Sequence, residues 1–404
     1  MNNEFQIECI ENKECFCCGN TNLKTVLDLG NQPLANDYHS GLTLQHKYPL
    51  RLNLCDDCFH LQLSHTVNPD LMFKHYLYVS GTTQTLKDYF DMFAKKTLEY
   101  NSEAKNILDI ACNDGSQLDK FKNKKINTFG IDPAENLYVL SSKKHNVFCG
   151  YIENYNPKKK FDIIVAQNVF AHVDNLDVFL SKVKQSMSKE SVFYIQTSQA
   201  NMLLNNEFDT IYHEHLSFFN SLSMKKVLKK HNLFLNNVFK TSVHGTSYVF
   251  EISMSNKIGN ISDVLVQELE SGLFDVDFYI KYSKKCLLCV QSLKKKIDAY
   301  KKKKYKIIGY GAAAKGNTLL NFSNISLDYI VDDNPLKQGM YTPGMNIPIV
   351  SIEKLNEFSK KDKICFVPLA WNFYEEIKNR IRKFRNFKSD KIIKYFPFYS
   401  EEIL

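Results

Sequence analysis

The sequence predicts an α/β protein, with a cysteine-rich amino-terminal module and two doubly wound domains behind it. Two C-x-x-C pairs fall within the first 60 residues. Strand and helix patterns then alternate in two separate stretches, which is typical of a parallel sheet covered by helices. The 404 residues, 44% of them hydrophobic, suffice for two or three domains of roughly 150 residues. We expect these domains at residues 1–75, 76–260 and 261–404.

Composition restricts the class of partner. The net charge of +8 comes from 52 basic and 44 acidic residues, and much of the excess lies in lysine-rich runs at 122–125, 158–160 and 301–304. Such runs are more typical of solvated faces than of nucleic-acid sites, although a basic protein favours a phosphate-bearing substrate. The start lacks signal-peptide regions, and no apolar run approaches the roughly 18 residues of a membrane helix. We therefore expect a cytoplasmic protein with a small-molecule substrate and no nucleic-acid or membrane partner.

The cysteines of the first module predict a metal centre. Eleven cysteines, an odd number without a secretion signal, argue against a disulfide framework. Two C-x-x-C knuckles each supply two corners of a tetrahedral zinc site, and we assign them to Cys15, Cys18, Cys55 and Cys58. The adjacent Cys17 is the alternative ligand. Four thiolates leave no open coordination position, so this zinc is expected to be structural.

The second stretch predicts a nucleotide-like cofactor site. A helix over 84–104 precedes a strand at 106–110, which runs into a polar turn, and Asp132 ends the next strand about 20 residues later. NAD-binding domains share this logic. However, the turn holds a single glycine, which argues against a pyrophosphate cradle and for S-adenosylmethionine (AdoMet), which carries no phosphate. The candidate cofactor-binding residues are Asp109, Asn113, Asp114, Gly115, Asp132 and Asn168.

A dense group of proton-transferring side chains lies at residues 207–219. Tyr212, His213, Glu214 and His215 are consecutive, and in an extended chain the two histidines would share one face. Surface histidines beside a core tyrosine, or a histidine-carboxylate metal site, are the alternative interpretations. Polar residues expected at the carboxyl edge of the central sheet favour an active site; they are Asn168, His172 and Gln199.

The third stretch repeats the strand–turn–helix pattern. A strand over 306–308 leads into Gly309–Gly316, and Asp332 ends a second strand over 327–331. Taken alone, this G-x-G-x-x-A arrangement indicates an NAD site, but Lys315 near the helix start suits the phosphates of another nucleotide equally well. Before it, residues 262–304 have a helical pattern, in which we expect the Cys286 and Cys289 pair to be buried.

These segments together resemble the sugar C-methyltransferases that act on nucleotide-linked keto-deoxysugars. The resemblance rests on the cysteine pairs, residues 76–82, the turn at 113–115, residues 168–173, 207–215 and 309–317, and matches near 332–339, 343–344 and 371–373. It implies a zinc-binding domain, a Rossmann-like class I methyltransferase domain and a Rossmann-like carboxyl-terminal domain. It also implies that a nucleotide-sugar lies between the last two domains and that the carboxyl-terminal glycine turn no longer binds NAD.

The same resemblance implies residue roles. His215 would be the catalytic base, assisted by Tyr212, Glu214, His172 and Tyr78. The substrate-binding residues would be Tyr76, Tyr310, Lys315 and Asn317. The chain departs from the pattern at 242–249, where His-Gly-Gly-Ser is usual, and at Ala313, which is often proline.

A sugar C–H next to a ketone can be deprotonated because the charge delocalises onto oxygen, and a histidine with a pKa of about 6.5 suits that step. The rival hypotheses are an O-methyltransferase on the same scaffold, a zinc-containing RNA methyltransferase and an NAD-dependent oxidoreductase. The sequence leaves open the sugar, the methylated ring carbon, the nucleotide (TDP, GDP or CDP) and the oligomeric state.

Overall fold

The computed structural model describes residues 8–73, 79–82, 84–122, 125–198, 200–241, 243, 247–396 and 399–404. The chain divides into two compact units, which we call unit 1 and unit 2. Unit 1 comprises Met1–Lys24, Asn53–Met202 and Glu214–Val276, and unit 2 comprises Thr25–Leu52, Leu203–His213 and Asp277–Leu404. Each unit is therefore assembled from separate chain segments. The division into three sequence domains stays a prediction.

The amino-terminal segment forms small sheets. Its elements are β1 (Cys9–Glu11), β2 (Leu23–Gln32), β3 (Tyr48–Cys55), β4 (Leu61–Leu63), β5 (His65–Val67), α1 (Asp70–Phe73) and η1 (Ser80–Thr82). Strand β1 pairs antiparallel with β5. A later strand, β11 (Ser217–Phe218), pairs antiparallel with β4, in a sheet of order β11-β4-β3-β2 among the described residues. The chain passes between the two units within β2 and β3.

Unit 1 contains the larger sheet, with the order β12-β13-β10-β9-β6-β7-β8 among the strands described. Its strands are β6 (Asn106–Ile110), β7 (Asn127–Asp132), β8 (Asn146–Cys149), β9 (Phe161–Gln167), β10 (Met187–Ser198), β12 (Phe234–Thr241) and β13 (Ser247–Ser253). The five strands from β10 to β8 run parallel, as predicted. Strands β13 and β12 are antiparallel additions at one edge, so the sheet is mixed and not purely parallel.

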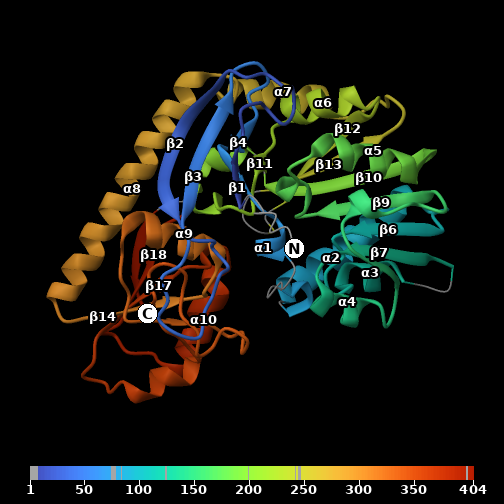
Figure 1. The fold of residues 1–404 in the computed structure, drawn as a ribbon. Helices are drawn as coiled ribbons and strands as arrows, with labels where there is room; N and C mark the ends of the chain where they lie inside the picture. Colours follow the sequence, from blue (N-terminus) through green and yellow to red (C-terminus); the bar gives the residue numbers. More distant parts are fainter. Residues whose placement is uncertain are drawn as a thin grey trace, which may run out of the picture. The chain divides into compact units, whose positions relative to one another are not determined.

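Helices cover both faces of this sheet (Figure 1). They are α2 (Gln84–Tyr100), α3 (Ser116–Phe121), α4 (Glu135–Ser141), α5 (Leu176–Ser186), α6 (Ser221–Lys230) and α7 (Ile261–Glu270), with short turns η2 (Ile152–Asn154), η3 (Phe170–His172) and η4 (Ala200–Asn205). Each face of the sheet packs against its own hydrophobic core, and alternate residues of β9 point into one core or the other. Ile163 packs with the aromatic face of α2, whereas Ile164 packs with α5 and α6.

Unit 2 contains a second sheet, ordered β16-β15-β14-β17-β18-β19 within the described chain. Its strands are β14 (Lys306–Tyr310), β15 (Tyr329–Val331), β16 (Ile349–Val350), β17 (Ile364–Pro368), β18 (Lys391–Lys394) and β19 (Ser400–Ile403). All neighbours pair in parallel except β18 and β19. The sheet confirms the predicted second α/β fold.

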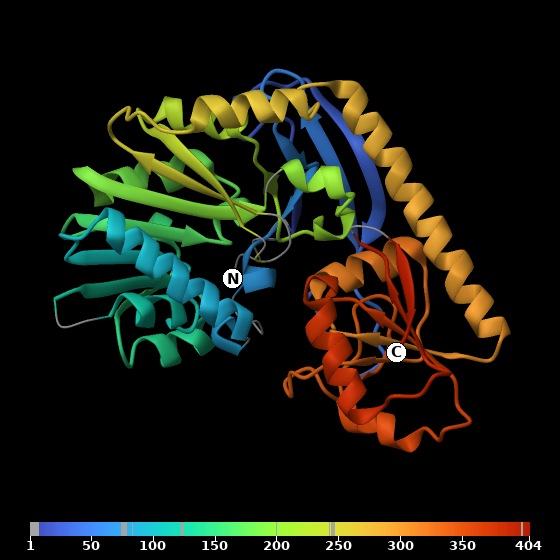
Figure 2. The same ribbon diagram turned by 180° about the vertical axis from the view of Figure 1, so that it is seen from behind.

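The remaining elements are η5 (Phe208–Thr210), α8 (Val276–Lys302), α9 (Ala314–Ser323), η6 (Ile352–Glu357), η7 (Trp371–Phe373) and α10 (Tyr374–Phe384). Figure 2 shows α10 against the sheet, where Ile377 and Ile381 join the core of Ile308 and Phe366. The helical pattern predicted over 262–304 is interrupted after α7, because Gly272 takes a left-handed φ of 83°. In the described part of the chain, no helix is long and apolar enough to cross a membrane.

Candidate active site and zinc centre

The four predicted cysteines form one cluster. The sulfur atoms of Cys15, Cys18, Cys55 and Cys58 all lie within 4.8 Å of one another. Cys15 and Cys58 are 3.6 Å apart, and Cys18 and Cys55 are 3.5 Å apart. Zinc–thiolate bonds of about 2.3 Å in a tetrahedron place sulfurs roughly 3.8 Å apart, so the cluster fits a four-thiolate zinc ion.

The two knuckles have the same backbone design. In each, the fourth residue after the first cysteine is left-handed, with φ of 79° at Gly19 and 52° at Phe59. Its N–H donates to the carbonyl of that first cysteine, at 2.8 Å for Gly19 to Cys15 and 3.0 Å for Phe59 to Cys55. Cys17 is not in the cluster. Burial raises the pKa of its thiol well above the usual value, so Cys17 stays neutral.

The second knuckle holds the segment that follows His215. Asn220 donates its side-chain N–H to the carbonyl of Phe59 at 2.6 Å. The imidazole of His60 and the hydroxyl of Ser217 form a hydrogen bond of 3.2 Å. Asn220 also caps α6 through a reciprocal pair of bonds with Ser223. The zinc module of unit 1 therefore fixes the chain immediately after the predicted base.

The turn after β6 has the tight backbone that the sequence predicted. Asn113 and Gly115 have positive φ angles of 52° and 83°. Asp132, at the end of β7, accepts the N–H of Asn113 at 2.8 Å and that of Ala134 at 2.9 Å. A Cβ at Gly115 would lie 2.9 Å from the His145 ring, so glycine allows close packing here.

Two predicted cofactor residues also anchor the chain before α2. The side chain of Asn113 accepts the N–H of Ser80 at 3.0 Å, and that of Asp114 accepts the N–H of Gly81 at 3.1 Å. Asp109 is fully buried at the end of β6. Burial, together with the charges of Asp132 and Asp114, raises its pKa well above the ordinary value. The turn is thus an acidic environment, which suits a sulfonium cation and opposes a pyrophosphate.

The carboxyl ends of β9 and β10 carry polar groups that the sequence argument missed. Gln167 and Gln196 are register partners, and neither carboxamide has a hydrogen-bond partner among the described residues. The hydroxyl of Thr197 is likewise buried and unpartnered in that part of the chain. Asn168, with φ of 55°, donates its N–H to the carbonyl of Gln196 at 2.7 Å. Such buried groups need hydrogen bonds, which a ligand can supply. The signal available in the sequence was a polar residue ending an apolar strand; Gln199 lies outside the described residues.

His172 and His215 come together in unit 1. Their ring centroids are 5.1 Å apart, and Phe73 stacks on His172 at 5.6 Å. Burial lowers the pKa of His172 to about 4, so this imidazole is neutral near pH 7. Its Nε2 is buried with no hydrogen-bond partner in the described part of the chain. A neutral imidazole beside a second imidazole provides a hydrogen-bond donor and a base in one place.

The segment at 207–219 is not extended as we assumed. Residues Phe208–Thr210 form η5, and the chain then turns at 212–214 before β11. The division between the units falls between His213 and Glu214. In unit 2, His213 contacts the ring and carbonyl of Tyr48, the latter at 3.3 Å. Two-residue alternation therefore does not describe these histidines, because the backbone bends between them.

Other predicted residues have specific environments. Glu214 is buried in unit 1, and Tyr212 is half-buried in unit 2. Asn317 is buried, and its amide donates to the carbonyl of Ala35 and the hydroxyl of Tyr38. The two predicted tyrosines near 77, Tyr76 and Tyr78, lie outside the described residues.

The glycine turn of unit 2 repeats the design of the first turn. Asp332 accepts the N–H of Ala312 at 2.6 Å and that of Asn334 at 2.8 Å. Lys337 donates to the carbonyl of Ala312 at 2.7 Å, and the hydroxyl of Tyr310 donates to Asp333 at 2.9 Å.

Lys315 lies in the first turn of α9. Lys337, which the sequence argument did not name, brings a second cation to this turn. A helix start with two cations suits an anion.

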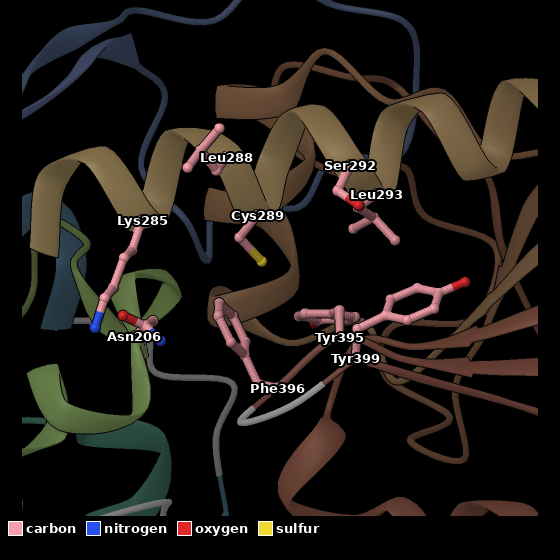
Figure 3. Close-up of a pocket in the computed structure, with 9 residues that line it drawn as sticks. All are labelled: Asn206, Lys285, Leu288, Cys289, Ser292, Leu293, Tyr395, Phe396 and Tyr399. Carbon is pink, nitrogen blue, oxygen red and sulfur yellow. The ribbon is translucent and has the colours of Figure 1, made fainter.

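A cavity of about 340 Å³ lies elsewhere in unit 2, between α8 and the residues around β19. Figure 3 shows Cys289 directing its sulfur toward Phe396 and Tyr395. None of the residues predicted for the site lines this cavity. Cys286 is buried, as predicted for the pair, whereas Cys289 is only half-buried.

Family models match three segments of the chain. A zinc binding domain model covers residues 15–73, a methyltransferase domain model covers 82–236, and a C-methyltransferase C-terminal domain model covers 242–397. The chain is an AdoMet-dependent C-methyltransferase. The four-thiolate cluster is the place where this C-methyltransferase would hold zinc.

Individual proteins are similar to all or part of the chain. The C-methyltransferase is 24% identical over 394 residues to C-methyltransferase NovU of Streptomyces niveus, covering 92% of each chain. A ubiquinone biosynthesis O-methyltransferase of Rhodopseudomonas palustris is 29% identical over 106 residues, which are 24% of this chain and 42% of that one. An S-adenosylmethionine-dependent methyltransferase structure from Clostridium acetobutylicum superposes with a TM-score of 0.36 at 14% identity, covering 44% of this chain and 93% of that one.

Proposed function

We propose that this enzyme methylates a nucleotide-linked keto-deoxysugar at the carbon next to the carbonyl, in surface-glycan or natural-product sugar biosynthesis. The observation that carries the proposal is the pair of His215, which is buried, and His172, whose Nε2 atom is buried, in unit 1. Carbon methylation needs a carbanion equivalent, and an imidazole can generate one only beside a carbonyl group. The similarity to C-methyltransferase NovU over nearly the whole chain supports the same reaction class.

In this mechanism His215 removes the proton from the carbon, and the electron pair moves onto the carbonyl oxygen to form an enolate. His172 stays neutral because burial lowers its pKa to about 4, so it donates a hydrogen bond without carrying a charge. Removing one such donor typically lowers the rate about 10²-fold. AdoMet, when bound, would supply the electrophilic methyl group that the enolate carbon accepts. The carboxamides of Gln167 and Gln196 are placed to hydrogen-bond a polar ligand at the same sheet edge.

We assign the nucleotide's diphosphate to unit 2. The N–H groups at the start of α9, with Lys315 and Lys337 nearby, form an environment for an anion. Tyr310 and Asn317 flank the same turn, and Tyr76 and Tyr78 keep their proposed roles. The domain limits predicted at 75 and 260 belong to the same proposal.

Solvent deuterium exchange tests the base. We expect His215→Asn to abolish both deuterium exchange into the keto-sugar and methyl transfer, whereas the control His231→Asn, at the end of α6 beside Asp177, retains both. A panel of TDP-, GDP- and CDP-linked 4-keto sugars, with AdoMet, identifies the substrate by a mass gain of one CH₂. Exchange retained in folded, zinc-loaded His215→Asn would refute the assignment of the base. An NMR spectrum with the new methyl on oxygen would establish the O-methyltransferase alternative.

A further inference from the structure

A buried carboxylate, the single tryptophan and a lysine form a contact chain in unit 2. Trp371 in η7 donates its indole N–H to Asp209 in η5 at 2.7 Å. The ammonium of Lys315, in the first turn of α9, lies 4.9 Å from the centroid of the Trp371 ring. Asp209 is 0% exposed and Trp371 is 7% exposed. Three separate chain segments therefore meet at one indole ring.

The arrangement has a chemical consequence for Lys315. A carboxylate that accepts the indole N–H pushes electron density into the ring, and an electron-rich face attracts a cation more strongly. The second carboxylate oxygen of Asp209 has no hydrogen-bond partner among the described residues. Lys315 is the positive charge that favours the ionised form of Asp209.

The other groups around Asp209 do not neutralise it. Glu207 of its own segment adds a like charge. The thiols of Cys286 and Cys289 and the phenol of Tyr282 face it from α8, and the phenol of Tyr395 faces it after β18. Burial raises the pKa of each of these thiols and phenols, so they remain neutral near pH 7. Lys315 is thus the cation to which the charge of Asp209 is coupled.

We propose that Asp209 and Trp371 are positioning residues that hold the Lys315 ammonium at the start of α9 for the diphosphate of the substrate. The inference rests on the proposed function, because it takes Lys315 as a diphosphate ligand. Asp209 acts through Trp371 and Lys315 and does not touch the reacting atoms. Free lysine side chains adopt many rotamers, and the indole face selects among them.

The sequence provides a direct probe, because Trp371 is the only tryptophan of the chain. Inorganic pyrophosphate should change the tryptophan fluorescence of the full-length enzyme, and Lys315→Met should abolish this change. We expect Asp209→Asn, which leaves the Trp371 ring beside Lys315, to weaken pyrophosphate binding about two- to fivefold, the size of a cation–π contact at the weak end of its range. Asp298→Asn, an exposed carboxylate on α8, is the matched control and should bind like the wild type.

A pH titration of the same fluorescence separates positioning from general structure. Burial raises the pKa of Asp209 to about 7, so the wild-type fluorescence should change with a midpoint near pH 7. The transition should be absent in Asp209→Asn and present in Asp298→Asn. In assays, Asp209→Asn should raise KM for the nucleotide-sugar and leave kcat and the KM for AdoMet unchanged. If Asp209→Asn does not fold, Trp371→Phe, which keeps a ring but loses the N–H, is measured by calorimetry and should show the same weaker pyrophosphate binding.

Two failures are distinguishable. If pyrophosphate does not bind to the wild-type enzyme, the assignment of the diphosphate to unit 2 is overturned, and this inference with it. Folded Asp209→Asn with the wild-type pyrophosphate affinity and the wild-type pH transition overturns only the role of Asp209.

Discussion

The first turns of the two large sheets are held by the same pattern of hydrogen bonds to an aspartate. In unit 1, Asp132 ends the second strand and accepts the N–H of Asn113, 19 residues before it. In unit 2, Asp332 accepts the N–H of Ala312, 20 residues before it. Each aspartate also accepts an N–H two residues further on, from Ala134 and Asn334. The same carboxylate thus ties the strand end to the turn in both sheets.

The side chains around the two turns differ in charge. Asp109 and Asp114 accompany Asp132 in unit 1, where burial and the charges of Asp132 and Asp114 raise the pKa of Asp109. Lys337 and Lys315 lie at the turn of unit 2, where Lys337 donates to the carbonyl of Ala312. In our proposal, the same hydrogen-bond pattern therefore serves a cationic cofactor in one unit and an anionic substrate group in the other.

Removing either aspartate should break only its own turn. Asp132→Ala leaves two buried N–H groups without their acceptor, and each such loss costs about 1–3 kcal/mol. We expect AdoMet affinity to fall at least about tenfold, with pyrophosphate binding unchanged. Asp332→Ala should do the reverse, and calorimetry with both ligands measures the two effects. Equal losses of both ligands in both variants would contradict two independent turns.

Glycine substitutions should have a smaller effect that differs between the turns. Gly115 and Gly311 both have positive φ, so alanine costs about 1–2 kcal/mol of unfolding free energy at either position. An alanine Cβ at 311 would lie 2.8 Å from the Cβ of Ala370, close to backbone, whereas at 115 it meets the His145 side chain. We expect Gly311→Ala to lower the unfolding free energy more than Gly115→Ala, by urea denaturation. The opposite order would show that His145 is the more rigid neighbour.

The comparison also shows what sequence can and cannot predict. The strand at 106–110 was predicted at its observed limits because a short, mostly apolar segment that ends in a polar turn is a strong signal. The antiparallel direction of β12 and β13 has no such signal, because residue alternation is the same in both directions.

Contacts between residues far apart in the sequence could not be predicted either. Asp209 and Trp371 are 162 residues apart in the sequence, and Lys337 reaches Ala312 across 25 residues. The four cysteines were predicted correctly because thiolate spacing within each knuckle is local.

Lys337 provides a milder test of the charge difference. Lys337→Met removes a cation and a hydrogen bond from the turn of unit 2, and one such charge-assisted bond contributes about 1.5–3 kcal/mol. Part of that free energy stabilises the fold and does not contribute to ligand binding. We therefore expect pyrophosphate affinity to fall severalfold and its dependence on salt to weaken. AdoMet binding should not change. Lys306→Met, an exposed lysine paired with Asp328, is the control. Unaltered salt dependence in Lys337→Met would remove Lys337 from the anion site.

The smallest expected effect is on pH-dependent stability, and in each unit we follow a buried carboxyl group whose pKa lies near 7. Burial raises the pKa of Glu268 in unit 1 and of Asp209 in unit 2 to about 7. Because both folded-state values exceed the unfolded ones, their contribution is complete below about pH 4 and is lost as the pH rises through 7.

We expect Tm to fall by a few degrees between pH 5 and 8. Glu268→Gln, which keeps an acceptor for the N–H and hydroxyl of Ser221, should flatten that slope, and the exposed Glu270→Gln on the same helix should not. A slope unchanged in Glu268→Gln would mean that the unit 1 carboxyl group ionises freely in the folded protein. Disappearance of the slope in Asp209→Asn would then locate the titration in unit 2.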